Sequence, residues 1–302
     1  MEYIVAVNKY RHFVTASEQC GVTQPTLSTM IQKLEEELNT KIFDRTKHPV
    51  EPTLMGIRII KQAEVALAEI KKIKEMISNE TGSLEGTLRI GIIPTLAPYI
   101  VPDFIHFFHE SYPQVELFIT EGRTQSLKSD LHKGFIDIMI AATPLEEKDF
   151  LEIPLYYEKF IAYFSDTKLI DGCCLAADQM PVQDLWVLQE GHCMRNQTFN
   201  FCKNFSSYNK MFEAGSIDTL IRIVDKNGGY SVIPELHIPY LTPEQQKKIK
   251  SIDNPPATRE ISLVIRNDFI KERLLNAVAD TIKKIIPQEM LDARLKKFSI
   301  RL

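Results

Sequence analysis

Residues 12–56 read HFVTASEQCGVTQPTLSTMIQKLEEELNTKIFDRTKHPVEPTLMG and contain two short helical patterns joined by a turn. In the first pattern, Phe13, Ala16 and Cys20 recur at helical spacing, and the small Ala16 lets a second helix cross closely. Gly21 follows at once and suits a sharp helix exit, because glycine adopts a positive φ at little cost. The segment from Tyr10 to Leu38 therefore predicts a helix-turn-helix.

The second helix of this pair has an apolar face and a polar face. Thr23 can cap its N-terminus, and Pro25 lies in the first turn, where the missing N–H costs little. The apolar stripe recurs at steps of four, three and four and consists of Leu27, Ile31, Leu34 and Leu38. The opposite face carries groups that can bond base edges and phosphates, namely Gln24, Thr26, Ser28, Thr29, Gln32 and Lys33. The pattern alone also fits a plain helical hairpin with a solvated face.

The same segment resembles the winged helix-turn-helix of the LysR family of bacterial transcription regulators. The resemblance rests on the QPTLS start of the recognition helix, its I-x-x-LE-x-x-L continuation, the FDRT wing and the later PT-x-x-G. It implies a DNA-binding domain over residues 1–58. The residues that would face double-stranded DNA are Gln24, Pro25, Thr26, Ser28, Thr29, Lys33 and Arg45. The segment departs from the family in its short first helix and in Ser17, which stands where a second alanine is common.

Composition bounds the class of protein without pointing to DNA. The 302 residues are 44% hydrophobic and 25% charged, which is typical of a globular protein with two or three packed units. The absence of a leader pattern and of a long apolar run predicts a cytoplasmic protein without a membrane segment. The net charge is −4, and residues 1–58 balance seven basic against seven acidic residues. Charge alone therefore does not indicate nucleic-acid binding.

A long helix is predicted from Leu54 to Ile77, where no proline occurs. Its apolar residues alternate in steps of three and four and are Ile59, Ala63, Ala66, Ile70, Ile73 and Ile77. A helix of this length spans about 36 Å, so one small domain cannot cover both of its sides. We expect residues 59–86 to form a dimerisation helix and hinge, as the LysR resemblance also implies for a homodimer or homotetramer. The alternative is a long helix packed on its own domain.

Residues 87–302 alternate strand-like and helical patterns. The order over 88–142 is βαβαβ, which predicts a parallel sheet, and strands and helices recur over 219–235 and 261–286. We expect an α/β protein with an all-α N-terminus, whose C-terminal part forms two lobes similar to the periplasmic-binding-protein-like regulatory domain of LysR regulators. Ligands of such folds bind between the lobes at strand ends. Thr95 and Thr124 follow strands in this way, although either could be a structural cap.

Two cysteines nine residues apart give the sharpest chemical signal, in EGHCMRNQTFNFC at 190–202. His192, Arg195 or a helix N-terminus beside Cys193 would favour its thiolate, the form that attacks peroxide. If MRNQTFNF is helical, the Cα atoms of Cys193 and Cys202 lie about 13 Å apart, whereas a disulfide requires about 7 Å or less. The bond would then need local unwinding, as a redox switch does. The alternative is that the two cysteines are buried for structural reasons and are unrelated to each other.

The cysteine segment resembles the redox centre of the peroxide-sensing OxyR subgroup of the LysR family. The shared features are GHC-x-R-x-Q with a second cysteine nine residues on, IPT-x-x-PY at 93–99 and LVIR at 263–266. The resemblance implies that Cys193 is the peroxidatic thiol and Cys202 the resolving one. It also implies a peroxide pocket lined by Thr95, Thr124, His192, Gln197 and Arg266. Asn196 departs from the subgroup, which commonly has aspartate there, and residues 203–215 also diverge.

Together these features predict a hydrogen-peroxide-sensing transcription regulator rather than an enzyme. The resemblance implies double-stranded DNA, RNA polymerase and a thioredoxin- or glutaredoxin-type reductant as partners, and it implies no cofactor. No cysteine or histidine cluster has zinc-finger spacing, so we expect no metal. Two alternatives stay open. One is a LysR-type regulator that senses a small metabolite between its lobes, and the other is a thiol peroxidase, which would not need residues 1–77.

Overall fold

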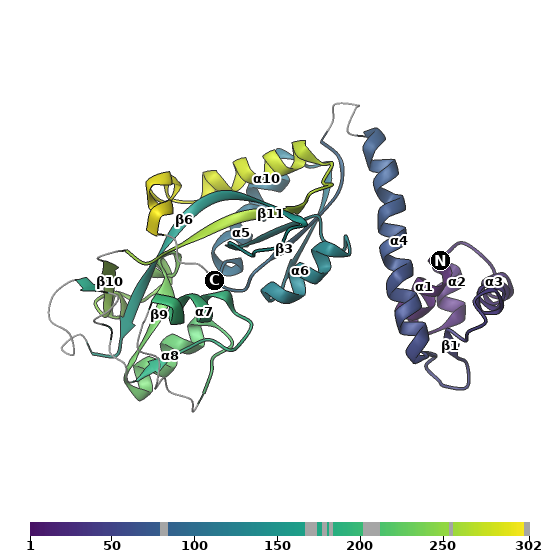
Figure 1. Ribbon diagram of the computed structural model, residues 1–302, viewed down its shortest axis with the longest axis horizontal. Coiled ribbons are helices and arrows are strands. Elements are labelled where there is room, and N and C mark those ends of the chain that lie inside the picture. The colour runs from purple at the N-terminus through teal and green to yellow at the C-terminus, as the bar shows by residue number, and fades with distance from the viewer. Residues whose placement is uncertain are drawn as a thin grey trace. The chain divides into compact units, whose positions relative to one another are not determined.

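The computed structural model describes residues 1–78, 84–166, 174–176, 180, 184–201, 212–253 and 256–298 (Figure 1). The chain forms two units, one built on Met1–Gly82 and one built on Ser83–His132 and Ile136–Leu302. Each has its own hydrophobic core, and the second has two. The structure confirms the predicted class, in which a helical N-terminal part precedes a mixed α/β part.

The first unit is a winged helix-turn-helix. Its elements are α1 (Glu2–Tyr10), α2 (Phe13–Gln19), α3 (Gln24–Glu37), the antiparallel wing β1 (Phe43–Asp44) and β2 (Glu51–Pro52), and α4 (Leu54–Ser78). The sequence patterns did not predict α1, whose Ile4 and Val7 complete the core against Ala16 and Leu27. The long helix is confirmed. The predicted domain border at residue 58 falls inside α4. Ile60 and Ala63, which follow that border, still belong to the core of the first unit.

The start of α3 follows its sequence, whereas its end does not. The backbone N–H of Thr26 donates to Thr23 Oγ1 at 3.4 Å, which confirms the predicted cap. Leu27 and Ile31 are buried, but Leu38 is 43% exposed, so the predicted apolar stripe ends one turn early. The reason is that α3 ends at Glu37. Asn39, whose φ is 48°, then turns the chain away from the core.

The second unit begins with the predicted βαβαβ order. Its elements are β3 (Gly86–Ile92), α5 (Ala97–Ser111), β4 (Val115–Glu121), α6 (Thr124–His132) and β5 (Ile138–Thr143). Strand β3 pairs in parallel with both β4 and β5, which confirms the parallel sheet. Two right-handed crossovers in opposite directions place α5 and α6 on opposite faces of this sheet. The N-terminal ends of both helices therefore meet the carboxyl ends of the strands.

A long strand that the sequence patterns missed joins the two lobes. Strand β6 (Phe150–Phe164) pairs antiparallel with β11 (Thr258–Arg266) along its first part. Its last residues pair with β9 (Tyr230–Pro234) and β10 (Ile249–Asp253). Pro154 and a shift in register interrupt the alternation of β6, which hides it from a period-two search. The two lobes of the unit therefore share one continuous sheet, whose order is β4-β3-β5-β11-β6-β10-β7.

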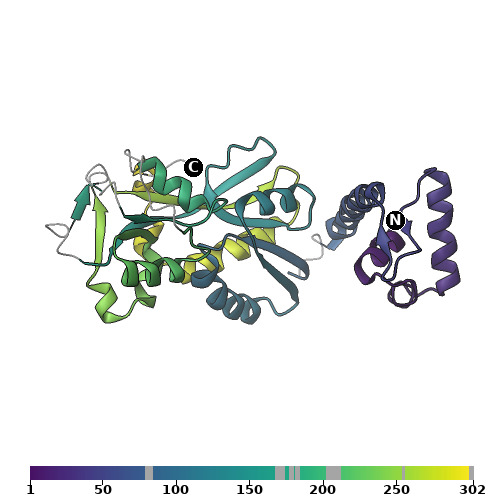
Figure 2. The ribbon, with the colours of Figure 1, turned by 90° about the horizontal axis from the view of Figure 1, so that it is seen from below.

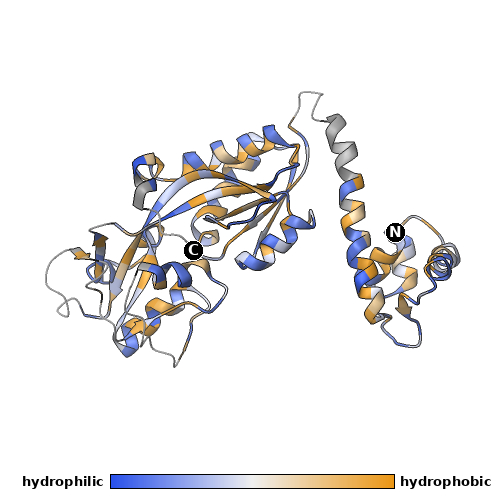
Figure 3. Ribbon diagram, viewed as in Figure 1, coloured by the Kyte–Doolittle hydropathy of each residue, from blue (hydrophilic) through white to orange (hydrophobic). Residues whose placement is uncertain are grey.

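Helices cover the sheet and complete both lobes. The remaining elements are β7 (Cys174–Ala176), β8 (Leu185–Trp186), α7 (Cys193–Phe201), α8 (Ile217–Asn227), η3 (Glu235–Tyr240), α9 (Pro243–Gln246), α10 (Glu272–Ile285), η4 (Gln288–Leu291) and η5 (Ala293–Phe298). Helices α5 and α10 lie side by side (Figures 1 and 2). Figure 3 shows the hydrophobic side of α10 turned toward the sheet, consistent with its buried Leu274, Val278 and Ile282.

Candidate functional site

Cys193 is the first residue of α7, and its side chain enters the core of the lobe that contains β3. It is a free thiol and only 6% exposed. Residues 194–201, for which the sequence allows a helix, lie in α7 (Cys193–Phe201). Cys202 lies outside the described residues, as do Cys173 and the side chain of Cys174. The structure therefore presents a buried thiol at a helix N-terminus, where backbone N–H groups favour an anion.

Two threonine hydroxyls from separate helix starts lie near this thiol. Thr95 is in the turn between β3 and α5 and is 2% exposed, and Thr124 is the first residue of α6. Burial raises the pKa of the Cys193 thiol. The charge of Arg259, the backbone N–H of Met194 and the hydroxyls of Thr124 and Thr95 act on this pKa in the opposite direction. The resting thiol is thus protonated but surrounded by groups that stabilise its thiolate.

Arg259 is the cation of this site, and the sequence patterns did not select it. It lies on β11 with 0% exposure, and its Nη1 donates to Thr95 Oγ1 at 2.9 Å. Its Nε and Nη2 both lie within 2.8 Å of Glu158 Oε2. Arginine keeps its charge in proteins, so this guanidinium is a permanent positive charge beside Cys193. The signal available in the sequence was TRE at 258–260, a charged run at the start of a buried strand.

Arg266 does not join this group, and its predicted place in the pocket is corrected. It lies at the far end of β11, where it pairs with Asp268 at 2.8 Å and donates from Nη1 to the His132 carbonyl at 3.0 Å. Seven residues separate it from Arg259, which corresponds to about 23 Å of strand. An odd separation also turns the two side chains to opposite faces of the sheet. Arg259 occupies the position beside Thr95 instead.

His192, which precedes Cys193, and Gln197, one turn further along α7, are both buried. Burial, with a smaller contribution from the charge of Arg123, lowers the pKa of His192, so this imidazole is neutral near pH 7. It therefore supplies hydrogen bonds rather than charge to its surroundings. Arg195, the other predicted activator, instead pairs with Glu213 at 2.7 Å and lies over the Phe199 ring.

Among the described residues, three buried polar atoms of Thr124, His192 and Tyr156 make no hydrogen bond of ordinary geometry. They are Thr124 Oγ1, His192 Nδ1 and the hydroxyl of Tyr156. Tyr156 belongs to the same core as Cys193 and is 0% exposed. Buried polar groups in proteins are nearly always bonded, so each of these atoms is a candidate partner for a small bound molecule with hydrogen-bond donors and acceptors. Hydrogen peroxide and water both have this chemistry.

The loop before α7 is fixed by a contact between segments far apart in the sequence. Arg123 Nη2 donates to Gln189 Oε1 at 2.8 Å. Gly191 has a φ of 94°, and a Cβ on it would lie 3.0 Å from Arg123 Cδ. The backbone conformation therefore favours glycine at this position, and a larger residue would also displace the Arg123 side chain. The contact holds the Gly191–His192 turn that delivers Cys193 to the start of α7.

The predicted DNA-facing residues gather on the outer side of α3 and on the wing. Gln24, Pro25, Thr26, Thr29 and Lys33 are exposed, and Ser28 is half-buried. Arg45 is exposed as well, but its guanidinium is not free of protein contacts. It donates from Nη1 to Ser28 Oγ at 3.1 Å, and its Nη2 lies 3.4 Å from Glu35 Oε2. The arginine thus links the wing to α3 and orients a cation along the polar face.

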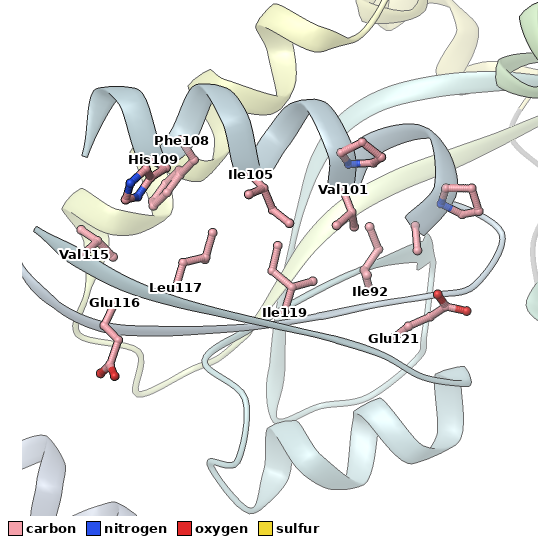
Figure 4. A pocket seen from close by; sticks show the side chains of 13 residues that line it. Ile92, Val101, Ile105, Phe108, His109, Val115, Glu116, Leu117, Ile119 and Glu121 are labelled. Carbon is pink, nitrogen blue, oxygen red and sulfur yellow. The ribbon is translucent and has the colours of Figure 1, made fainter. Parts of the chain in front are cut away.

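An apolar groove lies between α5 and β4, apart from the thiol site. Its volume is about 770 Å³, and none of the residues around Cys193 lines it. Figure 4 shows Ile105 and Phe108 of α5 facing Leu117 and Ile119 of β4. The groove is therefore bounded by one helix and the edge strand of the sheet, and it does not coincide with the inter-lobe position predicted for a small ligand.

The described residues hold no cluster of three or more histidine, cysteine or acidic side chains that could bind a metal ion. None of the helices within them combines the length and the apolar character needed to cross a bilayer.

Family models match both parts of the chain. Residues 1–57 match the bacterial regulatory helix-turn-helix protein of the lysR family, and residues 81–285 match the LysR substrate binding domain. The hydrogen peroxide-inducible genes activator of Haemophilus influenzae is 36% identical over 95% of this chain and 97% of its own length. The DNA-binding transcriptional dual regulator OxyR of Escherichia coli is 34% identical over 88% of each chain.

Solved structures agree with these relatives. A full-length OxyR variant from Pseudomonas aeruginosa matches with a TM-score of 0.74 and 31% identity, covering 93% of this chain and 96% of that chain. An OxyR variant from Corynebacterium glutamicum with bound hydrogen peroxide matches with a TM-score of 0.63 and 27% identity, covering 100% of this chain and 96% of that chain. The chain therefore belongs to the LysR family of bacterial transcription regulators and, within it, to the OxyR subgroup.

Proposed function

We propose that this chain is a transcription regulator that senses hydrogen peroxide through Cys193 and is switched by a disulfide between Cys193 and Cys202. The observation that carries the proposal is the buried thiol at the start of α7, with Arg259, Thr95 and Thr124 acting on it. The names of the relatives as hydrogen peroxide-inducible activators, and a similar structure with bound peroxide, support the choice of signal. His192 and Gln197 complete the pocket.

The chemistry proceeds in two balanced steps. The Cys193 thiolate attacks one peroxide oxygen, the O–O bond breaks, and the second oxygen leaves as hydroxide, which becomes water on gaining the thiol proton. Cys193 is then a sulfenic acid. Next, the Cys202 thiolate attacks this sulfur, the S–O bond breaks, and a second water leaves as the disulfide forms. Arg259 and the threonine hydroxyls stabilise the negative charge that develops on the leaving oxygen.

The disulfide requires a change of backbone. A helix that continued from Cys193 for nine residues would separate the two Cα atoms by about 13 Å and place them on opposite sides. Forming the bond therefore unwinds the C-terminal part of α7. We infer that this change in the regulatory domain of residues 87–302 alters contacts between subunits that pair through α4, within a dimer or a tetramer. The DNA-binding domains of residues 1–58 are then re-spaced along the DNA. A thioredoxin- or glutaredoxin-type reductant would reset the switch.

Mass spectrometry of alkylated protein tests this chemistry. A brief pulse of dilute peroxide is expected to remove two free thiols per chain, and the fragment spectra should place both at Cys193 and Cys202. Trypsin cleaves after Arg195, so the two cysteines fall on separate peptides that the disulfide joins. Cys20, which is free in the other unit, serves as the internal control and should remain alkylated throughout. Unchanged labelling of Cys193 after the pulse would reject the proposal.

The DNA-reading surface consists of Gln24, Pro25, Thr26, Ser28, Thr29, Lys33 and Arg45. Its amides and hydroxyls are suited to base edges, whereas Lys33 and Arg45 are suited to phosphates. The protein would act in the cytoplasm and contact RNA polymerase at the promoters that it controls. The family assignment argues against the thiol peroxidase alternative, because the relatives are regulators rather than enzymes. The metabolite alternative predicts no loss of thiols in the labelling experiment.

Lys33→Ala is expected to weaken binding to operator and to unrelated DNA by the same factor. The lysine is exposed on the polar face of α3, where a phosphate contact adds affinity without sequence information. The slope of log affinity against log salt should fall by about one for each Lys33 that contacts DNA. Fluorescence anisotropy with both DNAs over a salt series measures this. Lys9→Ala is the matched control, since Lys9 is exposed on α1, and an equal effect there would argue against the assignment.

A further inference from the structure

Glu158 and Arg259 form an ion pair that is completely withdrawn from solvent. They lie opposite each other in the register of β6 and β11, and both side chains have 0% exposure. Arg259 Nε donates to Glu158 Oε2 at 2.8 Å, and Nη2 lies 2.7 Å from the same oxygen. The other carboxylate oxygen, Oε1, accepts the backbone N–H of Leu236 at 3.0 Å. Both oxygens of Glu158 are thus bonded, which fixes its position.

The opposite side of the guanidinium faces the thiol site. Nη1 donates to Thr95 Oγ1 at 2.9 Å, and Nη2 donates to the Thr95 carbonyl at 3.1 Å. The charge of Arg259 favours the thiolate of Cys193. Arg259 is therefore held between Glu158 and Thr95. Its positive charge interacts both with the Glu158 carboxylate and with the sulfur of Cys193. A buried arginine without a partner would be costly, and the carboxylate offsets that cost.

The other titratable groups around the pair do not replace this carboxylate. Burial raises the pKa of Tyr156 and Tyr99 well above the usual range, so both phenols stay neutral. Burial lowers the pKa of His192 and of His237, so both imidazoles are neutral near pH 7. Within the described residues, other charged groups also act on these side chains or lie near the pair. They are Glu235 and Lys159 beside Glu158, Asp218 near Tyr99 and His237, and Arg123 near His192.

We propose that Glu158 is a positioning residue that limits the reactivity of Cys193 by compensating the charge of Arg259. The carboxylate fixes the guanidinium so that its N–H groups point at Thr95, and it cancels part of the field at the sulfur. The thiol then stays protonated in the resting protein. Oxidation is therefore restricted to a small oxidant that can enter the site and form hydrogen bonds with its polar groups. This inference rests on the proposed role of Cys193 as the reacting thiol.

The test measures the alkylation rate of Cys193 against pH in the full chain with Glu158→Gln. Glutamine keeps a hydrogen-bond acceptor for Arg259 and removes the negative charge. The midpoint of the Cys193 profile is expected to fall by about one pH unit, which gives about tenfold faster alkylation below both midpoints. Fragment mass spectrometry assigns the label, because trypsin separates Cys193 from Cys202 at Arg195, and fragment ions of the 169–195 peptide separate Cys193 from Cys173 and Cys174. An unchanged or higher midpoint would overturn the proposal.

Two further variants separate charge from packing. Asp137→Asn is the matched control, because Asp137 also joins a buried cation, Lys271 at 3.1 Å, and also accepts a backbone N–H, from Arg89. It should leave the midpoint unchanged, and an equal fall would contradict a specific role of Glu158. If Glu158→Gln does not fold, Glu158→Asp replaces it, because the shorter side chain keeps the negative charge but moves it away from Arg259. The midpoint of the Cys193 profile should then fall by less than the drop of about one pH unit expected for Glu158→Gln. No fall would overturn the proposal. No peroxide is used, so failure of the peroxide chemistry is measured separately, by the thiol labelling.

Discussion

Cys193→Ser is expected to abolish the peroxide-dependent change in the footprint that the protein leaves on its operator DNA. Serine lacks the sulfur that forms the sulfenic acid and the disulfide, so α7 has no reason to unwind. The variant should bind DNA with the footprint of the reduced protein, because the substitution lies outside residues 1–78, which form the DNA-binding unit and α4. DNase footprinting with and without peroxide, on the wild-type protein and on the variant, measures the difference directly.

Cys20→Ser is the appropriate control for this experiment. Cys20 is also a free thiol, but it is half-buried at the end of α2 in the DNA-binding unit, and burial raises its pKa. Unlike Cys193, it has no cation or hydroxyl among the described residues that acts to lower this pKa, and the charge of Glu2 raises it further, so its thiolate is not stabilised and this variant should keep the full peroxide-dependent change. If Cys193→Ser also kept it, oxidation of Cys193 could not be the signal.

Local chemistry made parts of the structure predictable from the sequence. The Thr23 cap, the first turn with Pro25 and the positive φ of Gly21 are each determined by one residue and its neighbours. The parallel strands β3 and β5 were predictable because both are apolar runs bounded by helical patterns. A run without glycine or proline made a helix over 194–201 possible, and α7 occupies this run and begins at Cys193.

The thiol site was only partly predictable because its groups meet through pairings between distant segments. Thr95 and Thr124 were selected because they follow strands, which is a local property. The choice between Arg259 and Arg266 depends on which end and which face of β11 lies beside Thr95. That depends on the register of β6 and β11, whose facing residues Glu158 and Arg259 are 101 positions apart. The exposure of Leu38 likewise depends on where α3 stops.

Arg259→Met is expected to lower the free energy of unfolding of the regulatory unit by about 3–5 kcal/mol. Methionine fills most of the space but leaves the Glu158 carboxylate buried without its cation, and it leaves Thr95 without two donors. Urea unfolding followed by tryptophan fluorescence measures the loss. The chain has one tryptophan, Trp186, which is 5% exposed and donates from Nε1 to the Gly228 carbonyl, so its signal reports this unit.

Adding Glu158→Leu to this variant should recover more than half of the lost stability. Removing both members of a buried ion pair eliminates the unpaired charge, which is the larger part of the cost, and leaves only the unbonded N–H of Leu236 and the Thr95 groups. A double variant as unstable as Arg259→Met would mean that the arginine contributes mainly by packing. A stable Arg259→Met protein would mean that Glu158 reaches solvent or another cation, and the buried charge balance assigned to this site would then be incorrect.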